Sequence, residues 1–280
     1  MELDLKTYKE EQLELLKAKF LALNEKCKVL IIEVGDDPGS KVYLKNKIKA
    51  LTKVGVDYVL EKFPCDASVD ELITLITKAN EDPSITGILL QLPLPEHLTL
   101  AKEKIINSID KDKDIDGLTI YNKGLLASFS DCLIPCTAKG IMRIFKLLNV
   151  SLKGKNVVII NRSELIGLPL FFLLLKEDAS VRIVHSQVKN IKEYTKKADI
   201  VVTAVGKKNF ITKDMVRKGA LIIDAGIVRE GRLVCGDVDY INVSKKAFVT
   251  KVPYGVGQMT VLEFIDNIYR AFLLKNGKLQ

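Results

Sequence analysis

The chain has no tryptophan, and aromatic residues make up only 6% of its 280 residues. Proteins that bind single-stranded nucleic acid stack the bases on aromatic side chains, and such a platform is hard to build here. The net charge of +8 would suit an anionic partner, but the lysines are dispersed and no basic run is interleaved with aromatics. We therefore expect small anionic ligands and no nucleic acid.

Cysteine and histidine are also scarce. The five cysteines are odd in number and scattered, which argues against a disulfide framework. Cys132 and Cys136 have CxxxC spacing, but neither histidine, His97 or His185, is near them in sequence, so we propose no metal site. No apolar run approaches the roughly 20 residues of a membrane span, and the charged amphipathic start lacks a signal-peptide core. We expect a cytoplasmic protein with reduced thiols and no membrane partner.

Strands and helices alternate in the first half of the chain. A buried strand is predicted at 28–35 and further strands at 56–63 and 86–95, with helices between them. Such alternation implies a parallel sheet, and ligands gather at the carboxyl ends of its strands. Residues 108–136 are expected to be irregular, and a domain boundary is expected near residue 137.

The second half has the layout of a nucleotide-binding domain. After a helix at 137–149, short β-branched strands separated by helix-length stretches are predicted at 156–160, 180–185, 198–206, 220–227 and 247–255. We therefore predict an α/β protein of two domains. An N-terminal three-layer α/β domain (1–136) is completed by the C-terminal helix (259–280), and a Rossmann-like domain with a parallel sheet spans 137–258.

Lys47 differs from the neighbouring lysines in its helical position. Turn residues at 35–39 precede Ser40, which we expect to cap a helix. On that helix Tyr43 and Lys47 share a row that borders the apolar stripe of Leu44, Ile48 and Leu51. An ammonium half-desolvated beside an aromatic ring gives up its proton more readily than in water. The alternative is a lysine stem that lies along the edge of the core.

A phosphate-binding loop is predicted after the strand at 156–160. The segment NRSELIGLPL places Arg162, Ser163 and Gly167 at a helix N-terminus, where free N–H groups attract phosphate. The usual GxGxxG is missing, so an ordinary strand-to-helix turn stays an alternative. The next strand ends at His185 and Ser186 with Lys189 close behind, and no carboxylate is present there to bind a ribose hydroxyl. These residues favour NADP, although each could be a solvated loop residue.

Several long segments together resemble one known family. They are VGDDPGSKVYLKNKIKA, GILLQLPLP, DKDIDGL, IPCTAKGI, the strand before NRSELIGLPL, DAGI, GDVDY and PYGVGQMT. They resemble the bifunctional methylenetetrahydrofolate dehydrogenase/methenyltetrahydrofolate cyclohydrolase family over roughly residues 28–270. The resemblance implies that the two domains face each other across a cleft. It also implies tetrahydrofolate derivatives as substrates, NADP as cofactor, with NAD possible, and a homodimer.

The resemblance also implies residue roles. Lys47 matches the catalytic lysine, Tyr43 its aromatic neighbour in the folate site, Gln91 the glutamine that tunes the lysine, and Asp116 the carboxylate that grips the pterin. Pro253 and Gly255 match further substrate-binding positions. The positions that match cofactor-binding residues are Asn161, Arg162, Ser163, Gly167, His185, Ser186 and Ile227.

The implied chemistry has two steps. 5,10-Methylenetetrahydrofolate loses a hydride and becomes 5,10-methenyltetrahydrofolate, a step that needs mainly positioning. Water then attacks the methenyl carbon to give 10-formyltetrahydrofolate, and Lys47 is expected to move the protons.

Three positions depart from the family pattern. Asn161 and Tyr254 stand where glycines are common, and Gln258 stands where proline is common. We expect Asn161 to bring a side chain close to the cofactor. Cofactor preference or one of the two activities could differ here, so a monofunctional dehydrogenase and a non-catalytic folate- or nucleotide-binding protein stay open as alternatives.

Overall fold

The computed structural model describes residues 3–231 and 233–278, which form two compact units. The first unit comprises residues 10–136 and 261–278, and the second comprises residues 3–9 and 137–260. Residues 3–9 were expected in the first domain, whereas their contacts group them with the second unit. Leu5 is buried, and residues 3–6 line a cavity together with Phe248 and Thr250 of the second unit.

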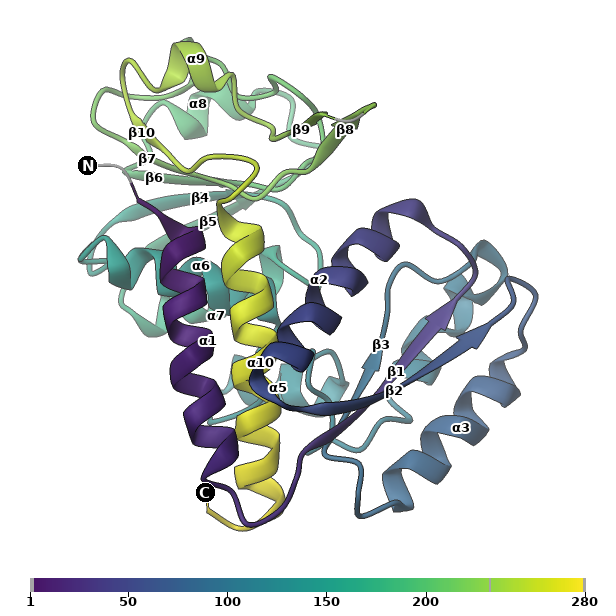
Figure 1. The fold of residues 1–280 in the computed structure, drawn as a ribbon. Coiled ribbons are helices and arrows are strands. Elements are labelled where there is room, and N and C mark those ends of the chain that lie inside the picture. The colour runs from purple at the N-terminus through teal and green to yellow at the C-terminus, as the bar shows by residue number, and fades with distance from the viewer. Residues whose placement is uncertain (1–2, 232, 279–280) are drawn as a thin grey trace. The chain divides into compact units, whose positions relative to one another are not determined.

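The first unit is built on a three-stranded parallel sheet in the order β2-β1-β3. Its elements are α1 (Leu5–Leu21, from Glu10 on), β1 (Lys28–Val34), α2 (Pro38–Val54), β2 (Asp57–Phe63), α3 (Val69–Glu81), β3 (Gly87–Leu90), η1 (Glu96–Ala101), α4 (Lys102–Ile106), α5 (Ile120–Ala127) and α10 (Val256–Lys275, from Val261 on). The two crossover helices, α2 and α3, lie on opposite sides of this sheet (Figure 1). α1 and α10 run side by side, with the rings of Phe20 and Tyr269 5.5 Å apart.

The β1 sequence explains its central place in this sheet. Its residues after Lys28 are buried, as expected for a β-branched run covered on both faces. β3 is shorter than the predicted strand at 86–95. It ends at Leu90, because Pro93 and Pro95 lack the N–H groups that would continue the ladder.

The cap of α2 differs from the prediction. Asp37, not Ser40, is the N-cap residue, and its carboxylate accepts the Ser40 N–H at 2.7 Å. Pro38 then takes the first helical position, where its missing N–H is not needed. The Ser40 hydroxyl instead donates to the carbonyl of Leu92 at 3.0 Å, which ties α2 to the end of β3.

The segment 108–136 is less irregular than expected, because it contains α5. Thr119 caps this helix by accepting the N–H of Asn122 at 3.3 Å. The backbone before it joins the sheet edge, where Ile88 donates to the carbonyl of Lys113 at 2.8 Å. Gly87 permits this approach, since a Cβ there would lie 2.3 Å from the Ile115 side chain.

The second unit contains a five-stranded parallel sheet in the order β10-β7-β6-β4-β5. Its elements are α6 (Cys136–Leu147), β4 (Asn156–Ile160), α7 (Gly167–Lys176), β5 (Ser180–Val184), α8 (Ile191–Thr195), β6 (Ile200–Thr203), η2 (Lys213–Met215), β7 (Leu221–Asp224), β8 (Val228–Glu230), β9 (Leu233–Cys235), α9 (Tyr240–Val243), β10 (Phe248–Val249) and the first turns of α10. Buried side chains of the strands form its core, among them Val158, Ile160, Val201 and Ile222.

Two features of this unit differ from the prediction. The antiparallel hairpin of β8 and β9 was missed, because each strand has three residues and little apolar pattern. The strand predicted at 247–255 is limited to Phe248–Val249. Beyond it, Pro253 has no N–H to donate, and Tyr254 has a φ of 78°, which no strand residue adopts.

Within the described part of the chain, no helix has the length and apolar character required to cross a membrane.

Candidate active site

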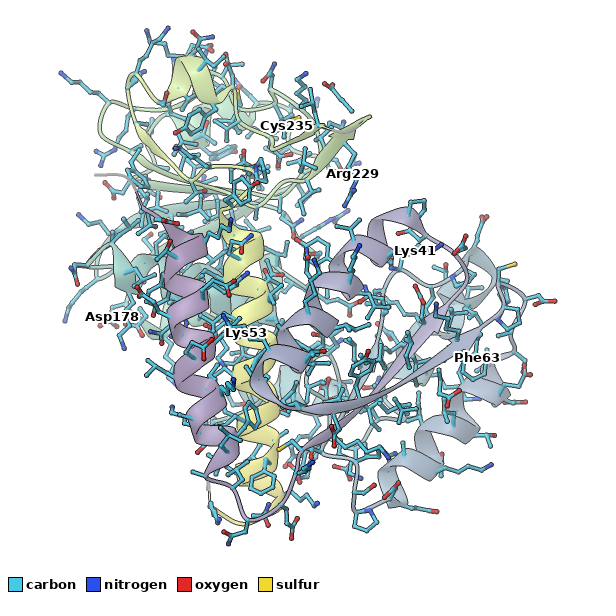
Figure 2. All side chains as sticks on the ribbon, in the orientation of Figure 1. Lys41, Lys53, Phe63, Asp178, Arg229 and Cys235 are labelled. Atoms are coloured by element: carbon cyan, nitrogen blue, oxygen red, sulfur yellow. The ribbon has the colours of Figure 1, made fainter. Side chains whose placement is uncertain are left out.

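Lys47 is the one lysine of the α2 segment 41–49 whose side chain is buried, with 5% of its surface exposed. Lys45 and Lys49 on the same helix are exposed. Figure 2 shows Lys41 and Lys53 toward the two ends of α2. The Lys47 ammonium lies 3.4 Å from each carboxylate oxygen of Asp116. The buried cation is thereby paired, as a charge removed from water requires.

The aromatic ring that faces the Lys47 ammonium belongs to Phe264 of α10. The Nζ atom lies 4.8 Å from the centre of this fully buried ring. Tyr43 was expected in this role from the helical spacing, and it is half-buried on α2 one turn before Lys47. Only the amphipathic pattern of the C-terminal helix pointed to Phe264, and that pattern does not identify its partner.

Asp116 is held by a rigid loop. Asp114, 1% exposed, accepts N–H bonds from Leu118 at 3.0 Å and Thr119 at 2.8 Å, and one from the Asn122 amide at 2.9 Å. Burial raises the pKa of the Asp114 carboxyl, and these hydrogen bonds oppose that effect. Gly117 follows with a φ of 67°, and a Cβ there would lie 2.5 Å from the carbonyl oxygen of Leu133, so only glycine fits.

Cys136 and Asn267 complete the surroundings of Asp116, and the sequence analysis missed both. The buried Cys136 thiol donates to the Asp116 carboxylate at 3.3 Å. The Asn267 amide, from α10, donates to the carbonyls of Ile115 at 2.9 Å and Ile134 at 2.8 Å. The CxxxC pair thus supplies an Asp116 contact, and no group of three or more metal-binding side chains occurs among residues 3–231 and 233–278.

Gln91 directly follows β3 and is also buried. Its backbone N–H donates to the Ile32 carbonyl at 2.9 Å and its side-chain N–H to the Leu92 carbonyl at 2.8 Å. Its side-chain oxygen is buried and has no hydrogen-bond partner among residues 3–231 and 233–278. Because an unmet buried acceptor is costly, this oxygen fits a donor supplied by a ligand.

The predicted phosphate loop connects β4 to α7. Arg162 is exposed at its start. Gly167 is buried as the first residue of α7, and a Cβ there would lie 2.2 Å from the Asn161 carbonyl oxygen. Ser163 accepts the N–H of Ile166 at 3.2 Å. The loop therefore turns tightly at the carboxyl end of β4. The N-terminus of α7, which is the positive end of the helix dipole, lies there and favours an anion.

Residues after the neighbouring strand β5 add polar groups at the same sheet edge. β4 and β5 pair in parallel from Asn156 and Ser180 onward, so their carboxyl ends are adjacent. His185 is half-buried, with Nδ1 accepting the Gln187 N–H at 3.4 Å, while Ser186 and Lys189 are exposed. Hydroxyl, imidazole and ammonium groups at this position suit a phosphate ester.

The loop after β6 has a glycine, Gly206, at this edge of the sheet, so its backbone is not covered by a side chain there. Gly206 has a φ of 75°, and a Cβ there would meet only the Ile227 carbonyl oxygen, at 4.0 Å. Asp237, fully buried, fixes this loop by accepting the N–H groups of Val205 at 2.6 Å, Gly206 at 2.8 Å and Lys207 at 2.9 Å. A fixed loop with open space at Gly206 and an exposed Ile227 side chain fits a dinucleotide.

Asp224 stabilises the neighbouring loop after β7 through hydrogen bonds to backbone N–H groups. It accepts N–H groups from Gly226, Asp237 and Val238, each at 3.0 Å. Burial raises the pKa of Asp224 from 3.8 to about 6, and the nearby Asp237 charge adds to the rise.

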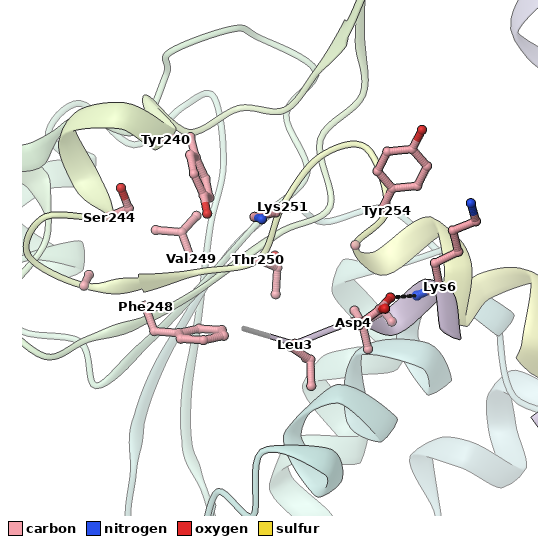
Figure 3. A pocket seen from close by; sticks show the side chains of 13 residues that line it. Leu3, Asp4, Lys6, Tyr240, Ser244, Phe248, Val249, Thr250, Lys251 and Tyr254 are labelled. Atoms are coloured by element: carbon pink, nitrogen blue, oxygen red, sulfur yellow. Dashed lines mark hydrogen bonds between the residues drawn. The ribbon is translucent and has the colours of Figure 1, made fainter. Parts of the chain in front are cut away.

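The 253–257 turn adjoins a cavity of about 1040 Å³ in the second unit (Figure 3). Tyr254 and Gly255 line it, together with residues 3–6. Tyr254 is 59% exposed, and the Lys6 ammonium lies 5.8 Å from its ring centre. Gly255 has no room for a side chain, because a Cβ there would lie 2.1 Å from the carbonyl oxygen of Lys251.

Comparison with known proteins decides the family. Residues 3–116 match the tetrahydrofolate dehydrogenase/cyclohydrolase catalytic domain, and residues 135–276 match the NAD(P)-binding domain of the same family. The chain belongs to the tetrahydrofolate dehydrogenase/cyclohydrolase family. It is thus an enzyme of tetrahydrofolate one-carbon chemistry with an NAD(P)-binding second unit, as the resemblance implied.

Relatives of this enzyme cover nearly its whole length. The "Bifunctional protein FolD" of Wolbachia sp. subsp. Drosophila simulans is 46% identical over 251 residues, 88% of this chain and 85% of that protein. The crystal structure of the bifunctional FolD of Campylobacter jejuni superposes with a TM-score of 0.92 at 36% identity, covering 99% of this chain and 98% of that one. The Trypanosoma brucei FolD, solved with NADP and an inhibitor, gives a TM-score of 0.92 at 28% identity, with 97% of each chain covered.

Proposed function

We propose that this enzyme oxidises 5,10-methylenetetrahydrofolate with NADP and hydrolyses the methenyl product to 10-formyltetrahydrofolate, with Lys47 as the proton-transfer residue. The observation that carries the proposal is the pairing of a buried Lys47 ammonium with the Asp116 carboxylate at 3.4 Å. A buried cation held in a fixed place between a carboxylate and an aromatic ring is suited to proton transfer at a defined atom.

The surrounding groups support distinct roles. Asp116, fixed by the loop around Asp114, would accept hydrogen bonds from the pterin and orient Lys47. Gln91 has a buried side-chain oxygen that no described residue contacts by a hydrogen bond, which fits a donor on the folate or on the attacking water. Tyr43 would pack against the folate from the same helix as Lys47. Pro253 and Gly255 stay predictions as further folate contacts.

The dehydrogenase step requires no proton transfer from these side chains. When bound, NADP accepts the hydride from the one-carbon bridge. The protein residues hold the folate in place and exclude water. NADP, rather than NAD, is supported by the exposed Arg162, Ser186 and Lys189 at the edge of the sheet, and by the NADP bound to the Trypanosoma brucei relative. Asn161, Ser163, Gly167, His185 and Ile227 are proposed as the remaining residues of that site.

Substitution of Lys47 tests the catalytic assignment. Lys47→Met should lower the cyclohydrolase rate at least about 100-fold, because the methionine side chain fills similar space but has no group that can donate or accept a proton. Binding of 5,10-methylenetetrahydrofolate, followed by fluorescence or calorimetry, should change only a few-fold. Lys45→Met and Lys49→Met, at exposed positions of the same helix, are matched controls and should keep full activity. Full cyclohydrolase activity in Lys47→Met would refute the role.

Separate assays distinguish the alternatives. NADPH formation without loss of the methenyl absorbance would indicate a monofunctional dehydrogenase. A protein that binds folate but turns it over with neither NAD nor NADP would be a binding protein. We further propose a homodimer in the cytoplasm that supplies one-carbon units for purine biosynthesis, and sedimentation of the purified protein tests the dimer.

A further inference from the structure

Asn161 stands in the cofactor loop at a position where glycine is common in the family. Its backbone does not require glycine, since Asn161 is not among the described residues with a positive φ. Its side chain is only half-buried, yet it is engaged within the loop. The expectation that this side chain lies close to the cofactor stays a prediction.

The Asn161 side-chain oxygen accepts three hydrogen bonds from its own loop. The donors are the backbone N–H of Ser163 at 2.8 Å, the Ser163 hydroxyl at 2.7 Å and the N–H of Gly167 at 3.1 Å. The Ser163 hydroxyl in turn accepts the N–H of Ile166 at 3.2 Å. Two consecutive N–H groups at the start of α7, those of Ile166 and Gly167, are thus satisfied by side chains of the loop.

The other end of the Asn161 amide reaches a second loop. Its Nδ2 donates to the carbonyl of Ala204 at 2.7 Å, directly before residues 205–207, which the carboxylate of Asp237 holds. Asn161 therefore joins the loop after β4 to the loop after β6. Both loops follow strands whose carboxyl ends form the ligand-binding edge of this sheet.

We propose that Asn161 is a positioning residue for the dinucleotide, whose amide holds the phosphate loop in its binding shape before the cofactor arrives. A glycine would leave the Ser163 and Gly167 donors to water and would release the link to Ala204. A loop already ordered loses less entropy when the diphosphate binds, so this chain binds the cofactor more tightly than its glycine variant. The proposal concerns NAD(P) binding alone and does not depend on the catalytic role of Lys47.

Asn161→Gly tests the proposal without turnover. In the protein without cofactor, hydrogen exchange of the Ser163 and Gly167 amides should accelerate at least about tenfold. The Kd for NADP, measured by calorimetry, should rise about tenfold, which corresponds to about 1.4 kcal/mol. Adenosine 2′-monophosphate carries no diphosphate, and its Kd should change less than about twofold. Unchanged exchange, or NADP binding as tight as or tighter than in the original chain, would overturn the proposal.

Two further variants serve as a control and as a test that does not depend on the folding of Asn161→Gly. Asn149→Gly, in the same unit at a φ of 50°, is the matched control and should change neither exchange at the loop nor NADP binding. Asn161→Asp retains an acceptor for Ser163 and Gly167, so slow exchange of these two amides should persist even if Asn161→Gly does not fold. Rapid exchange of both amides in Asn161→Asp would count against the proposal.

Discussion

The ammonium of Lys47 on α2 lies 4.8 Å from the centre of the Phe264 ring on α10, two residues that are far apart in the sequence. The ring is fully buried, so the contact is shielded from water, where cation–π attraction is strongest. Together with the Asp116 carboxylate, the ring fixes the position of the only strongly buried lysine of α2.

Phe264→Leu should lower the cyclohydrolase kcat about tenfold, because the ammonium loses the surface that holds it, and a desolvated cation–π contact is worth about 1–2 kcal/mol. Stability should fall by about 1–2 kcal/mol from lost packing. Phe145→Leu, at a 1% exposed site in the second unit, is the control: it should lose similar stability in urea unfolding and retain the cyclohydrolase rate. Equal rate losses in both variants would assign the effect to packing alone.

The raised pKa of Asp224 makes stability depend on pH. Its carboxyl has a pKa of about 6 when folded and 3.8 ordinarily, so the folded state binds this proton more tightly. The stabilisation is therefore complete below about pH 4 and is lost as pH rises through about 6, a change of roughly 3 kcal/mol.

Asp224→Asn should remove this contribution to the slope of unfolding free energy between pH 4 and 6.5, because an amide does not ionise. The amide will destabilise the protein at every pH, because its NH₂ group faces N–H donors. The test is therefore how the unfolding free energy changes with pH, and not its value at any one pH. Asp178→Asn, at an exposed site where asparagine suits the φ of 60°, should leave the slope unchanged. A variant at position 224 with the original slope would contradict the assignment.

Thiol reactivity should differ sharply between two cysteines of the first unit. Burial raises the pKa of the Cys27 thiol to about 11, whereas Cys65 is exposed. Since the thiolate is the nucleophile, Cys65 should react with a disulfide reagent at pH 8 at least about 100-fold faster than Cys27. Mass mapping of timed reactions measures this, and Cys65→Ser should remove the fast phase. Rapid labelling of Cys27 in the folded protein would contradict the burial.

Local patterns predicted some parts of this fold well and could not predict others. The apolar run Asn156–Ile160 forms β4 at its predicted bounds, because an uninterrupted β-branched run between polar residues has few alternatives. The N-cap of α2 was misplaced, because Asp37 and Ser40 are both good caps and only the position of Pro38 decides between them.

In the candidate site, too, some residues could be predicted from local patterns and others could not. Lys47 was identified from helical spacing, since one row of α2 borders the apolar stripe. The Phe264 ring and the Cys136 thiol depend on contacts between distant segments, which periodicity does not encode. The inward orientation of the Asn161 amide depends on the loop conformation, which was also beyond the sequence pattern.

Tyr254 should carry a conformational cost that a glycine would relieve. Its φ of 78° lies in the left-handed region, which costs a residue with a Cβ about 1 kcal/mol or more. Tyr254→Gly removes this cost but also loses the ring that the Lys6 ammonium faces at 5.8 Å, a contact worth about 0.5 kcal/mol at an exposed site. We expect a net gain of about 0.5 kcal/mol in unfolding free energy.

Tyr254→Ala separates the two contributions, because alanine loses the ring but keeps the Cβ. It should therefore be less stable than Tyr254→Gly by about 1 kcal/mol, a difference that urea unfolding of the two variants measures directly. Lys6→Met, which removes only the cation, should cost no more than about 0.5 kcal/mol. If the alanine variant were as stable as the glycine variant, the strain at position 254 would be no larger than the extra conformational entropy that glycine loses on folding, and the prediction would be wrong.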